Sequence, residues 1–273
     1  MMNVERPAPF VLISSNHGTM IINRNDYHTD EQGLGLGVGY QLMTKSCFDT
    51  QEVNLALALL RTRQRNFGAG VVAIDCGANI GVHTVEWGRM MHKWGRVISF
   101  EAQEKIFYAM AGNVAINNCL NVTARWAAVG AECGTLQIPE PDYLVPSSFG
   151  SFELKKRAGT EYIGQQIDYE GGKMKTVELV SIDSLGLERL DFIKIDVEGM
   201  EVEVLQGARN AIARFRPQMM IEVLKSDVEE IQRIVTAAGY QVFPLGLNLL
   251  AVHEDDPVRQ KISLENGIFT LGA

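Results

Sequence analysis

Two short segments of the chain combine glycines with carboxylates at spacings that suit ligand binding. The first is Asp75-Cys76-Gly77-Ala78-Asn79-Ile80-Gly81, which directly follows the apolar run at 71–74. Glycines let the backbone approach a ligand without interference from Cβ, and a following helix offers free N–H groups and a positive dipole end. Glu101 ends another apolar run twenty residues after Gly81, where a carboxylate can accept two hydrogen bonds from a ribose diol. We therefore predict a nucleoside cofactor.

The residues of this turn favour a cationic cofactor over a dinucleotide. A dinucleotide-binding turn reads G-x-G-x-x-G, and its middle glycine lets the pyrophosphate approach, but this chain reads Gly77-x-Asn79-x-Gly81. Asp75, at the end of the strand, would repel a pyrophosphate and attract the charged amino-acid end of S-adenosylmethionine. Two glycines also occur in turns that bind nothing. We predict S-adenosylmethionine, with S-adenosylhomocysteine as its product, and keep NAD as the alternative.

A lysine and two carboxylates alternate in the second segment, Lys194-Ile195-Asp196-Val197-Glu198. These side chains point the same way if the strand expected at 192–196 continues, and they then share the rim of the sheet with the glycine turn. Glu222 is a charge inside the apolar run 219–224, which is costly unless it is paired or functional. Lys194 is its expected partner. A purely structural Lys–Glu pair suits the sequence equally well, and Glu198 could simply begin the next helix.

These side chains suit methyl transfer to an oxygen. An in-line displacement needs an oriented acceptor and a base for its proton. We expect Asp196 to be the base, with Glu198 as the second candidate, Lys194 beside them and His83 as an outside candidate. Two close carboxylates raise each other's pKa, or they could bind Mg²⁺ instead. We predict no metal ligands, and the four cysteines and five histidines follow no metal-binding spacing.

Apolar runs alternate with helical patterns along the chain. Strands that alternate with helices indicate βαβ units and a parallel sheet covered on both faces, an α/β doubly wound fold. Two late runs, at 240–243 and 247–252, are too close for a crossover helix and should form an antiparallel hairpin. The expected strands are 71–75, 97–101, 122–129, 192–196 and 219–224, and the expected helices are 50–67, 82–93, 103–117, 200–215 and 227–238.

The first 48 residues are predicted to be an extension of the domain formed by residues 49–273, because they are too few for a domain of their own. Runs at 10–14 and 20–23 indicate a hairpin. Four alternating glycines at 33–39 follow without a preceding strand, an obvious helix start or a Walker lysine, so we expect a flexible connector or lid there.

Two local features remain. Asp49-Thr50-Gln51-Glu52 is a capping-box-like start for the first helix of the domain. Residues 139–175 hold three prolines, a polar glycine-containing region and little periodicity. Such a long irregular stretch either shapes a substrate pocket or forms a disordered loop, and the sequence supports both interpretations equally.

Composition excludes several classes of protein. Of the 273 residues, 46% are hydrophobic and 21% charged, which suffices for a sizeable core and shows no sign of disorder. The formal net charge is −8, so a nucleic-acid backbone is not an expected partner. No apolar run reaches the roughly 18 residues of a membrane span, and residues 1–9 lack a secretory signal. We expect a cytoplasmic protein with reduced thiols.

Taken together, the motifs resemble the FkbM family of S-adenosylmethionine-dependent methyltransferases. They are the segments 72–81, 100–102, 192–199 and 203–208, and the resemblance covers roughly residues 50–225. It implies a class I methyltransferase (Rossmann-like) fold and O-methylation of hydroxyls on sugars, glycoconjugates or polyketide-type metabolites. Met200 stands where the family often has an aromatic residue, and His83 inherits no role. The resemblance carries cofactor contacts onto Asp75, Gly77, Asn79, Gly81, Glu101 and Ala102.

Two rival functions stay open at this point. One is an NAD-dependent oxidoreductase on a similar sheet, and the other is a methyltransferase-like protein that binds the cofactor or a partner without turnover. The presence of Lys194, Asp196 and Glu198 argues against loss of catalysis. The Asn/Asp-Pro-Pro-Tyr motif of many amino-directed enzymes is missing, which favours an oxygen acceptor. The expected partner is therefore a small-molecule or carbohydrate acceptor.

Overall fold

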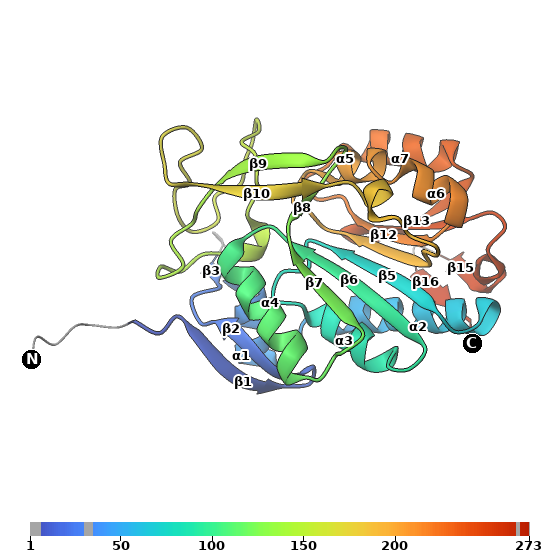
Figure 1. Cartoon of the computed structure of the whole chain (residues 1–273), viewed down its shortest axis with the longest axis horizontal. Helices are drawn as coiled ribbons and strands as arrows, with labels where there is room; N and C mark the ends of the chain where they lie inside the picture. Colours follow the sequence, from blue (N-terminus) through green and yellow to red (C-terminus); the bar gives the residue numbers. More distant parts are fainter. Residues whose placement is uncertain (1–6, 30–34, 266–267, 273) are drawn as a thin grey trace, which may run out of the picture.

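A seven-stranded sheet forms the centre of the molecule (Figure 1). The structure, a computed structural model, describes residues 7–29, 35–265 and 268–272. Strands β12, β11, β5, β6 and β7 are parallel, whereas β14 is antiparallel to both β12 and β13. The order across the sheet is β13 (Tyr240–Leu245), β14 (Asn248–His253), β12 (Gln218–Glu222), β11 (Phe192–Ile195), β5 (Val71–Cys76), β6 (Gly95–Glu101) and β7 (Val122–Trp126).

Alternate residues of β5 fill two separate cores, because successive side chains of a strand point to opposite faces. Val71 and Ala73 pack with α2 and α3, and Val72 and Ile74 pack with α5, α6 and α7 on the other face. The α4 helix covers β6 and β7. The helices are α1 (Val38–Lys45), α2 (Thr50–Phe67), α3 (Val82–Met90), α4 (Glu104–Ile116), α5 (Glu201–Gln206), α6 (Arg209–Phe215) and α7 (Val228–Ala237).

Smaller sheets surround this core. After β7 the chain enters a separate three-stranded sheet with the order β8, β10, β9. The hairpin β1–β2 packs against α4 (Figure 1). These strands are β1 (Phe10–Ser15), β2 (Gly18–Asn23), β3 (His28–Thr29), β4 (Gly35–Leu36), β8 (Ala128–Val129), β9 (Gly134–Pro139), β10 (Met174–Val180), β15 (Ile262–Glu265) and β16 (Ile268–Leu271). Three 3-10 turns add η1 (Phe149–Ser151), η2 (Ile182–Leu185) and η3 (Pro257–Lys261).

The strand order reverses at β5. The chain runs outward from β5 through β6 to β7 and then returns to β11 on the other side of β5. Ligands of open α/β sheets bind outside the carboxyl ends of the strands at such a switch point. The two segments that the sequence singles out, after β5 and after β11, therefore meet at one place.

The N-terminal hairpin is held by polar contacts to the main domain. The Asn113 side chain of α4 pairs with the backbone N–H and carbonyl of Ile21 and also donates to the carbonyl of Ile80. Asp26 accepts hydrogen bonds from the backbone of Gly39 and of Phe149. The hairpin expected at 10–14 and 20–23 is confirmed, while the division into an extension and a domain remains a prediction.

The structure corrects several expectations. The run expected as one strand at 122–129 is interrupted at Ala127, and its two parts join different sheets. The helix expected at 200–215 is broken at Gly207-Ala208 into α5 and α6. In the glycine-rich segment, β4 and α1 begin where a connector was expected, and Gly33 lies outside the described residues. Asp49 precedes α2 without a side-chain capping bond.

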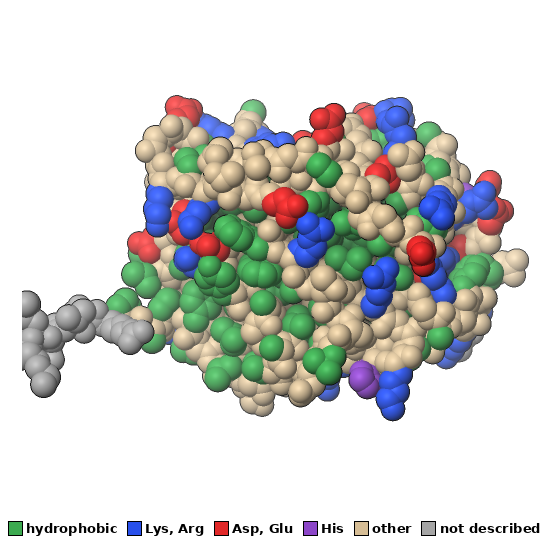
Figure 2. Space-filling model, viewed as in Figure 1, with side chains coloured by type: hydrophobic (Ala, Val, Ile, Leu, Met, Phe, Trp, Pro, Cys, Tyr) green, Lys and Arg blue, Asp and Glu red, His purple; other side chains and the backbone are tan. Residues whose placement is uncertain are grey.

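The surface carries a mixture of charges. Figure 2 shows Lys and Arg interspersed with Asp and Glu on this face, and hydrophobic side chains gathered over α4 and the N-terminal hairpin. Leu12, Tyr108 and Leu120 are exposed large hydrophobic residues of these elements and of the turn after α4. Within the described residues, no helix combines the length and the apolar character that a membrane crossing needs.

Candidate active site

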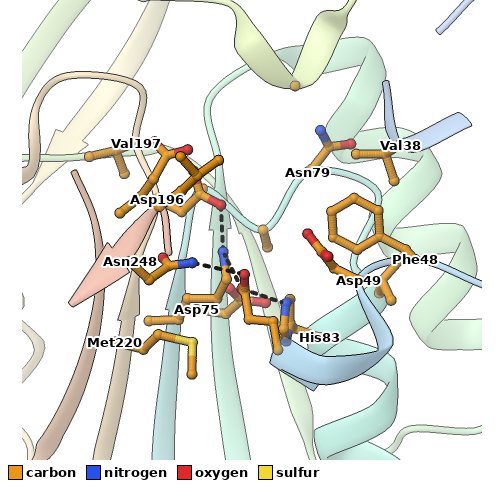
Figure 3. Close-up of a pocket in the computed structure, with 18 of the residues that line it drawn as sticks. Val38, Phe48, Asp49, Asp75, Asn79, His83, Asp196, Val197, Met220 and Asn248 are labelled. Carbon is orange, nitrogen blue, oxygen red and sulfur yellow. Dashed lines mark hydrogen bonds and ion pairs between the residues drawn. The ribbon is translucent and has the colours of Figure 1, made fainter. Parts of the chain in front are cut away.

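A cavity of about 1310 Å³ opens at the carboxyl ends of β5, β6, β11 and β12. Its walls include the glycine turn after β5, the end of β6 and the segment after β11. Helix α2, the start of α1 and the loop between β9 and β10 complete it. Figure 3 shows Asp75, Asn79, Asp196 and His83 around this space. Both segments singled out by the sequence thus contribute to one site.

The glycine turn is pressed against the segment after β11. Gly77 has a φ of 78°, and a Cβ at this position would lie 1.7 Å from the carbonyl oxygen of Asp196. Only glycine combines this left-handed backbone with such a close approach. The N–H groups of Gly77 and Ala78 both donate to the carbonyl of Phe100. The turn is therefore fixed to β6 on one side and to Asp196 on the other.

Glu101 closes the turn from the end of β6. Its two carboxylate oxygens accept hydrogen bonds from the backbone N–H groups of Asn79 (2.9 Å) and Gln103 (2.8 Å). Burial raises the pKa of Glu101 to about 7, although these two N–H groups oppose the shift. Each oxygen keeps a second lone pair, so Glu101 can still accept hydrogen bonds from a diol in the cavity that it lines.

Asp75 lies one residue before the end of β5 and is buried. One of its oxygens accepts a hydrogen bond from the hydroxyl of Thr84 at 2.6 Å. The other oxygen has no hydrogen-bond partner in the described part of the chain. Burial raises the pKa of Asp75, while the positive charge of Lys194 opposes the shift. An unpartnered buried acceptor beside a cavity is a place where a ligand donor or a water can bind.

Lys194 is the cationic centre of the cavity floor. Its ammonium lies 2.5 Å from a carboxylate oxygen of Asp196 and 3.8 Å from Glu52. Burial alone would lower the pKa of Lys194, but the carboxylates of Asp196, Glu52 and Asp75 outweigh it and raise the pKa. Lys194 therefore stays protonated. The pair expected between Lys194 and Glu222 is wrong, because the Lys194 ammonium turns toward Asp196 and Glu52 instead.

Glu52 extends this network from α2. One of its oxygens lies 3.1 Å from Nε2 of His83, and the other accepts a hydrogen bond from the Asn248 amide at 3.0 Å (Figure 3). Burial raises the pKa of Glu52, but Lys194 and His83 outweigh this and bring it to about 2. Glu52 is thus a fixed negative charge that helps to hold the Lys194 ammonium beneath Asp196.

Three carboxylates gather where the segment after β11 and the end of β12 line the cavity. Ligand atoms of Asp196, Glu198 and Glu222 lie within 4.8 Å of one another, a spacing that could hold a metal ion. Burial and the charge of Asp196 raise the pKa values of Glu198 and Glu222. Two of the three already face ammonium groups, because Asp196 pairs with Lys194 and Glu198 with Lys225.

The three side chains of the second segment are not simply presented by one strand. β11 ends at Ile195, and Glu198 has a left-handed backbone with φ 54°. The chain turns there, so Glu198 faces Lys225 while Asp196 faces Lys194. The side chain of Asp196 is 31% exposed, whereas that of Lys194 is 5% exposed. Asp196 is thus the accessible member of this ion pair.

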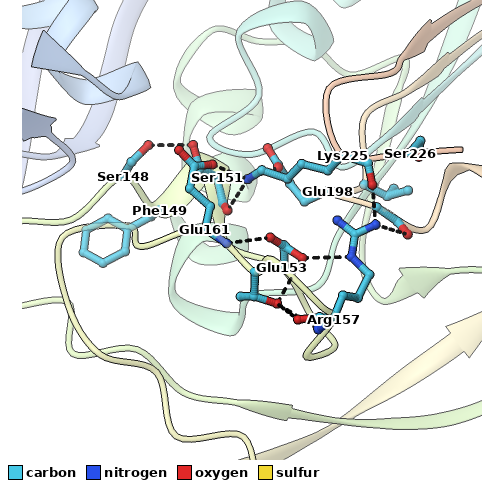
Figure 4. A network of polar contacts seen from close by, with 12 residues as sticks. Ser148, Phe149, Ser151, Glu153, Arg157, Glu161, Glu198, Lys225 and Ser226 are labelled. Carbon is cyan, nitrogen blue, oxygen red and sulfur yellow. Dashed lines mark hydrogen bonds and ion pairs between the residues drawn. The ribbon is translucent and has the colours of Figure 1, made fainter. Parts of the chain in front are cut away.

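The loop between β9 and β10, residues 140–173, forms one wall of the cavity through Ser148, Ser151, Phe152 and Glu161 among others. This irregular stretch therefore lines the cavity, and its role toward a substrate remains a prediction. Lys225, three residues after β12, holds the loop by contacting the Ser151 carbonyl at 2.7 Å and Glu161 at 2.8 Å (Figure 4). The same ammonium lies 2.7 Å from Glu198.

A second cation strengthens this attachment. Arg157 pairs with Glu153 at 2.9 Å within the loop and donates to the carbonyls of Gly199 and Lys225. Figure 4 shows Arg157 and Lys225 side by side, each reaching from one segment to the other. The loop is consequently joined to the segments that carry Glu198 and Lys225.

Most residues predicted from the sequence reach the cavity. Gly77, Asn79, Glu101, Ala102, Asp75, Lys194, Asp196 and Glu198 line it. Gly81 is not among the lining residues and instead precedes α3 with φ 85°. Three further residues of the site were not predicted from the sequence: Glu52, Asn248 and Lys225. Glu52 had a usable signal, because it shares the buried face of α2 with Ala56 and Leu59 at helical spacing.

The residues present fit S-adenosylmethionine. The glycine turn lines the cavity, Glu101 can accept from a ribose diol, and the free oxygen of Asp75 can accept from an ammonium. The negative groups on this wall match the positive charges of that molecule rather than a pyrophosphate. Roles of individual residues toward it remain predictions.

The sheet topology and the site define a class I methyltransferase fold. Residues 75–242, more than half of the chain, match the FkbM methyltransferase domain. The chain belongs to the FkbM methyltransferase family, whose methyl donor is S-adenosylmethionine. The family assignment favours neither the oxidoreductase nor the non-catalytic alternative.

Individual proteins are similar to parts of this chain. The methyltransferase sdnD of Sordaria araneosa is 29% identical over 164 residues, which are 52% of this chain and 62% of that protein. A solved FkbM methyltransferase from Methylobacillus flagellatus is 18% identical, with a TM-score of 0.47, over 68% of this chain and 43% of that one. A Pyrococcus abyssi tRNA (uracil-54, C5)-methyltransferase, solved with S-adenosylhomocysteine, is 12% identical, with a TM-score of 0.44, over 90% of this chain and 45% of that one. The chain thus spans about three fifths of the curated relative's length.

Proposed function

We propose that the protein transfers a methyl group from S-adenosylmethionine to a hydroxyl oxygen of a small molecule, such as a sugar, glycoconjugate or secondary metabolite. The observation that carries this proposal is the position of Asp196. Its backbone carbonyl touches the glycine turn, while its partly exposed side chain lies on Lys194 and faces the cavity. One residue thus joins the cofactor side of the site to the acceptor side.

The chain's own residues supply orientation and proton transfer. When bound, S-adenosylmethionine supplies a methyl group activated by a positively charged sulfur. Asp196 accepts the proton of the acceptor hydroxyl as that oxygen forms its new bond to carbon. Lys194 holds the Asp196 carboxylate in place, and Glu52 holds Lys194. Glu222, whose raised pKa favours the protonated form, can donate a hydrogen bond to a further oxygen of the acceptor.

An oxygen-rich small acceptor suits this cavity better than a nucleic acid. The acceptor side is lined by carboxyl groups of Asp196, Glu198 and Glu222, and the negative charges of Asp196 and Glu198 would repel a phosphate backbone. Carboxyl groups are also the natural partners of sugar hydroxyls.

Cofactor binding is the first test. Calorimetric titration should show binding of S-adenosylmethionine and S-adenosylhomocysteine, weaker binding by Glu101→Ala, and none of NAD. Binding of NAD alone would overturn the proposal. Binding without product from any hydroxylated acceptor would favour a non-catalytic protein.

The base is tested by substitution. Asp196→Asn should lower kcat about 10²- to 10⁴-fold, with the affinity for S-adenosylhomocysteine changed less than about twofold. Glu198→Gln should have a smaller effect, and Glu188→Gln, an exposed carboxyl away from the cavity, should have none. The measurement is methyl transfer at saturating acceptor from a panel of hydroxylated sugars and metabolites. Full turnover in both Asp196→Asn and Glu198→Gln would refute the carboxylate mechanism.

A further inference from the structure

The cavity continues along α2 beyond the cofactor turn and the acid cluster. The residues of α2 that line it recur every three or four positions, from Gln51 through Leu55 and Ala58 to Arg61 and Arg65. This spacing places them on one face of the helix. The lining face therefore runs for almost the whole length of α2.

The opposite wall of this extension is apolar. It is formed by Leu245 at the end of β13 and by Phe269 and Leu271 of β16, and β16 lies near α2 (Figure 1). These three side chains and Leu55 are only partly buried against the core. The α2 groove, lined by Leu55, Ala58, Leu245, Phe269 and Leu271, can thus bury further apolar surface of a ligand.

Two cations close the outer end of the α2 groove. Arg61 and Arg65 are exposed, line the cavity and have no ion-pair partner in the described part of the chain. By contrast, Arg63 on the buried face pairs with Asp191 and Asp256. Like charges four residues apart on a helix repel each other, and Arg65 alone is favoured by its place in the last turn. An anion between Arg61 and Arg65 would relieve this repulsion.

The cavity is therefore polarised from end to end. Carboxyl groups of Glu52, Asp196 and Glu222 lie at the reaction end, and unpaired arginines lie at the other. Nine to thirteen residues of helix separate Glu52 from Arg61 and Arg65, which is about 14–20 Å at 1.5 Å per residue. The cavity volume of about 1310 Å³ also exceeds the roughly 300–1,000 Å³ of a pocket for one small ligand.

We infer that the α2 groove binds the remote end of the methyl acceptor, and that this acceptor joins its reacting hydroxyl through an apolar body to a carboxylate or phosphate. This inference rests on the proposed methyl transfer and specifies its substrate class. Hydrophobic burial along the groove provides affinity, and the two arginines select molecules whose anionic group lies about 14–20 Å from the hydroxyl.

The test measures binding, so that it does not depend on turnover. ω-Hydroxymyristate, its neutral methyl ester and ω-hydroxytetradecyl phosphate are titrated into the protein with and without S-adenosylhomocysteine. The wild type should bind the acid or the phosphate about tenfold more tightly than the ester. The two anions together distinguish a carboxylate from a phosphate as the preferred group.

Three variants locate the contact. Arg61→Gln combined with Arg65→Gln should weaken anion binding about tenfold and leave the ester unchanged. Ala58→Trp should weaken all three probes by filling the groove. Arg209→Gln, an exposed arginine of α6 outside the cavity, is the matched control and should change nothing. Thermal unfolding of each variant verifies that it is folded.

An affinity for both the acid and the phosphate that is no higher than that for the ester, an unchanged double arginine variant, or no binding of any probe would overturn the inference. S-adenosylhomocysteine titration separates this failure from failure of the proposed function. If S-adenosylhomocysteine binds normally and the acid, ester and phosphate probes do not bind, only the assignment of the α2 groove is refuted. If that ligand does not bind the wild type either, the methyl-transfer proposal falls as well.

Discussion

At the residue scale, Glu101 combines burial with a fixed set of backbone donors. The residue is 6% exposed, and burial raises the pKa of its carboxyl group from 4.5 to about 7. The folded protein therefore binds a proton on Glu101 that the unfolded chain has already lost at pH 5–7. Stability from this group is present at low pH and is lost as the pH rises through the folded pKa.

In the wild type, the titration of Glu101 lowers the free energy of unfolding as the pH rises from about 4.5 to 7. We predict that Glu101→Gln makes this decrease smaller by on the order of 3 kcal/mol. Glutamine keeps the size of the side chain but does not titrate. Urea unfolding at several pH values measures this. Glu188→Gln, which removes an exposed carboxyl, should keep the wild-type pH profile. An identical slope in wild type and Glu101→Gln would show that Glu101 is not the titrating group.

At the element scale, the turn between β5 and α3 depends on one glycine. We predict that Gly77→Ala lowers the free energy of unfolding by more than about 2 kcal/mol, because it combines a left-handed backbone with a clash against the Asp196 carbonyl. Gly186→Ala is the matched control, since Gly186 also has a positive φ but has no atom within 4 Å of its added Cβ.

The difference between these two variants isolates crowding from backbone strain. Chemical unfolding measures both, and titration with S-adenosylhomocysteine follows the site. If Gly77→Ala lowers the free energy of unfolding no more than Gly186→Ala does, the contact between the glycine turn and the segment after β11 is not tight.

A second element-scale prediction concerns the loop at 140–173. Lys225→Met removes an ammonium that contacts Ser151, Glu161 and Glu198. We expect on the order of 2 kcal/mol of lost stability and faster proteolytic cleavage of this loop, because opening becomes easier. Lys156→Met is the control, since Lys156 pairs with Glu170 on the exposed side of the same loop. Equal cleavage rates in the two variants would contradict a holding role for Lys225.

At the scale of the whole molecule, a buried charge cluster connects distant parts of the chain. Arg63 of α2 contacts Asp191, which precedes β11, at 3.3 Å and Asp256, which follows β14, at 2.9 Å. All three side chains are nearly inaccessible. The cluster holds α2, and with it Glu52 and the α2 groove, against the central sheet.

We predict that Arg63→Met lowers the free energy of unfolding by about 3–5 kcal/mol, because it leaves the buried carboxylate of Asp256 without its cation and leaves Asp191 with Arg189 alone. Arg61→Met, two residues away but exposed, should change stability by less than about 0.5 kcal/mol. Thermal and urea unfolding compare them. If Arg63→Met lowers the free energy of unfolding as little as Arg61→Met does, the charge cluster makes no net contribution to stability.

Local patterns explain how much of the fold was predictable. Four central strands could be predicted because strands buried on both faces are continuous apolar runs in the sequence. They are β5, β6, β11 and β12. The strands β9 and β10 were missed because each pairs mainly with the other in a small sheet and carries exposed polar residues. The split into α5 and α6 depends on Gly207, whose Cβ would clash with the carbonyl of Gly130, a contact far away in the sequence.

The sequence alone determined the α/β fold class, the glycine turn after β5 and the carboxylates Glu101 and Asp196, because each depends on residues that are neighbours along the chain. Only the tertiary structure decided which charges meet. The sheet order places β11 between β5 and β12, and this brings Glu52, Lys194 and Asn248 into one network. Electrostatic and hydrogen-bond energies depend on distance in space, so Lys194 pairs with Asp196 and Glu52, and not with the Glu222 that the sequence suggested.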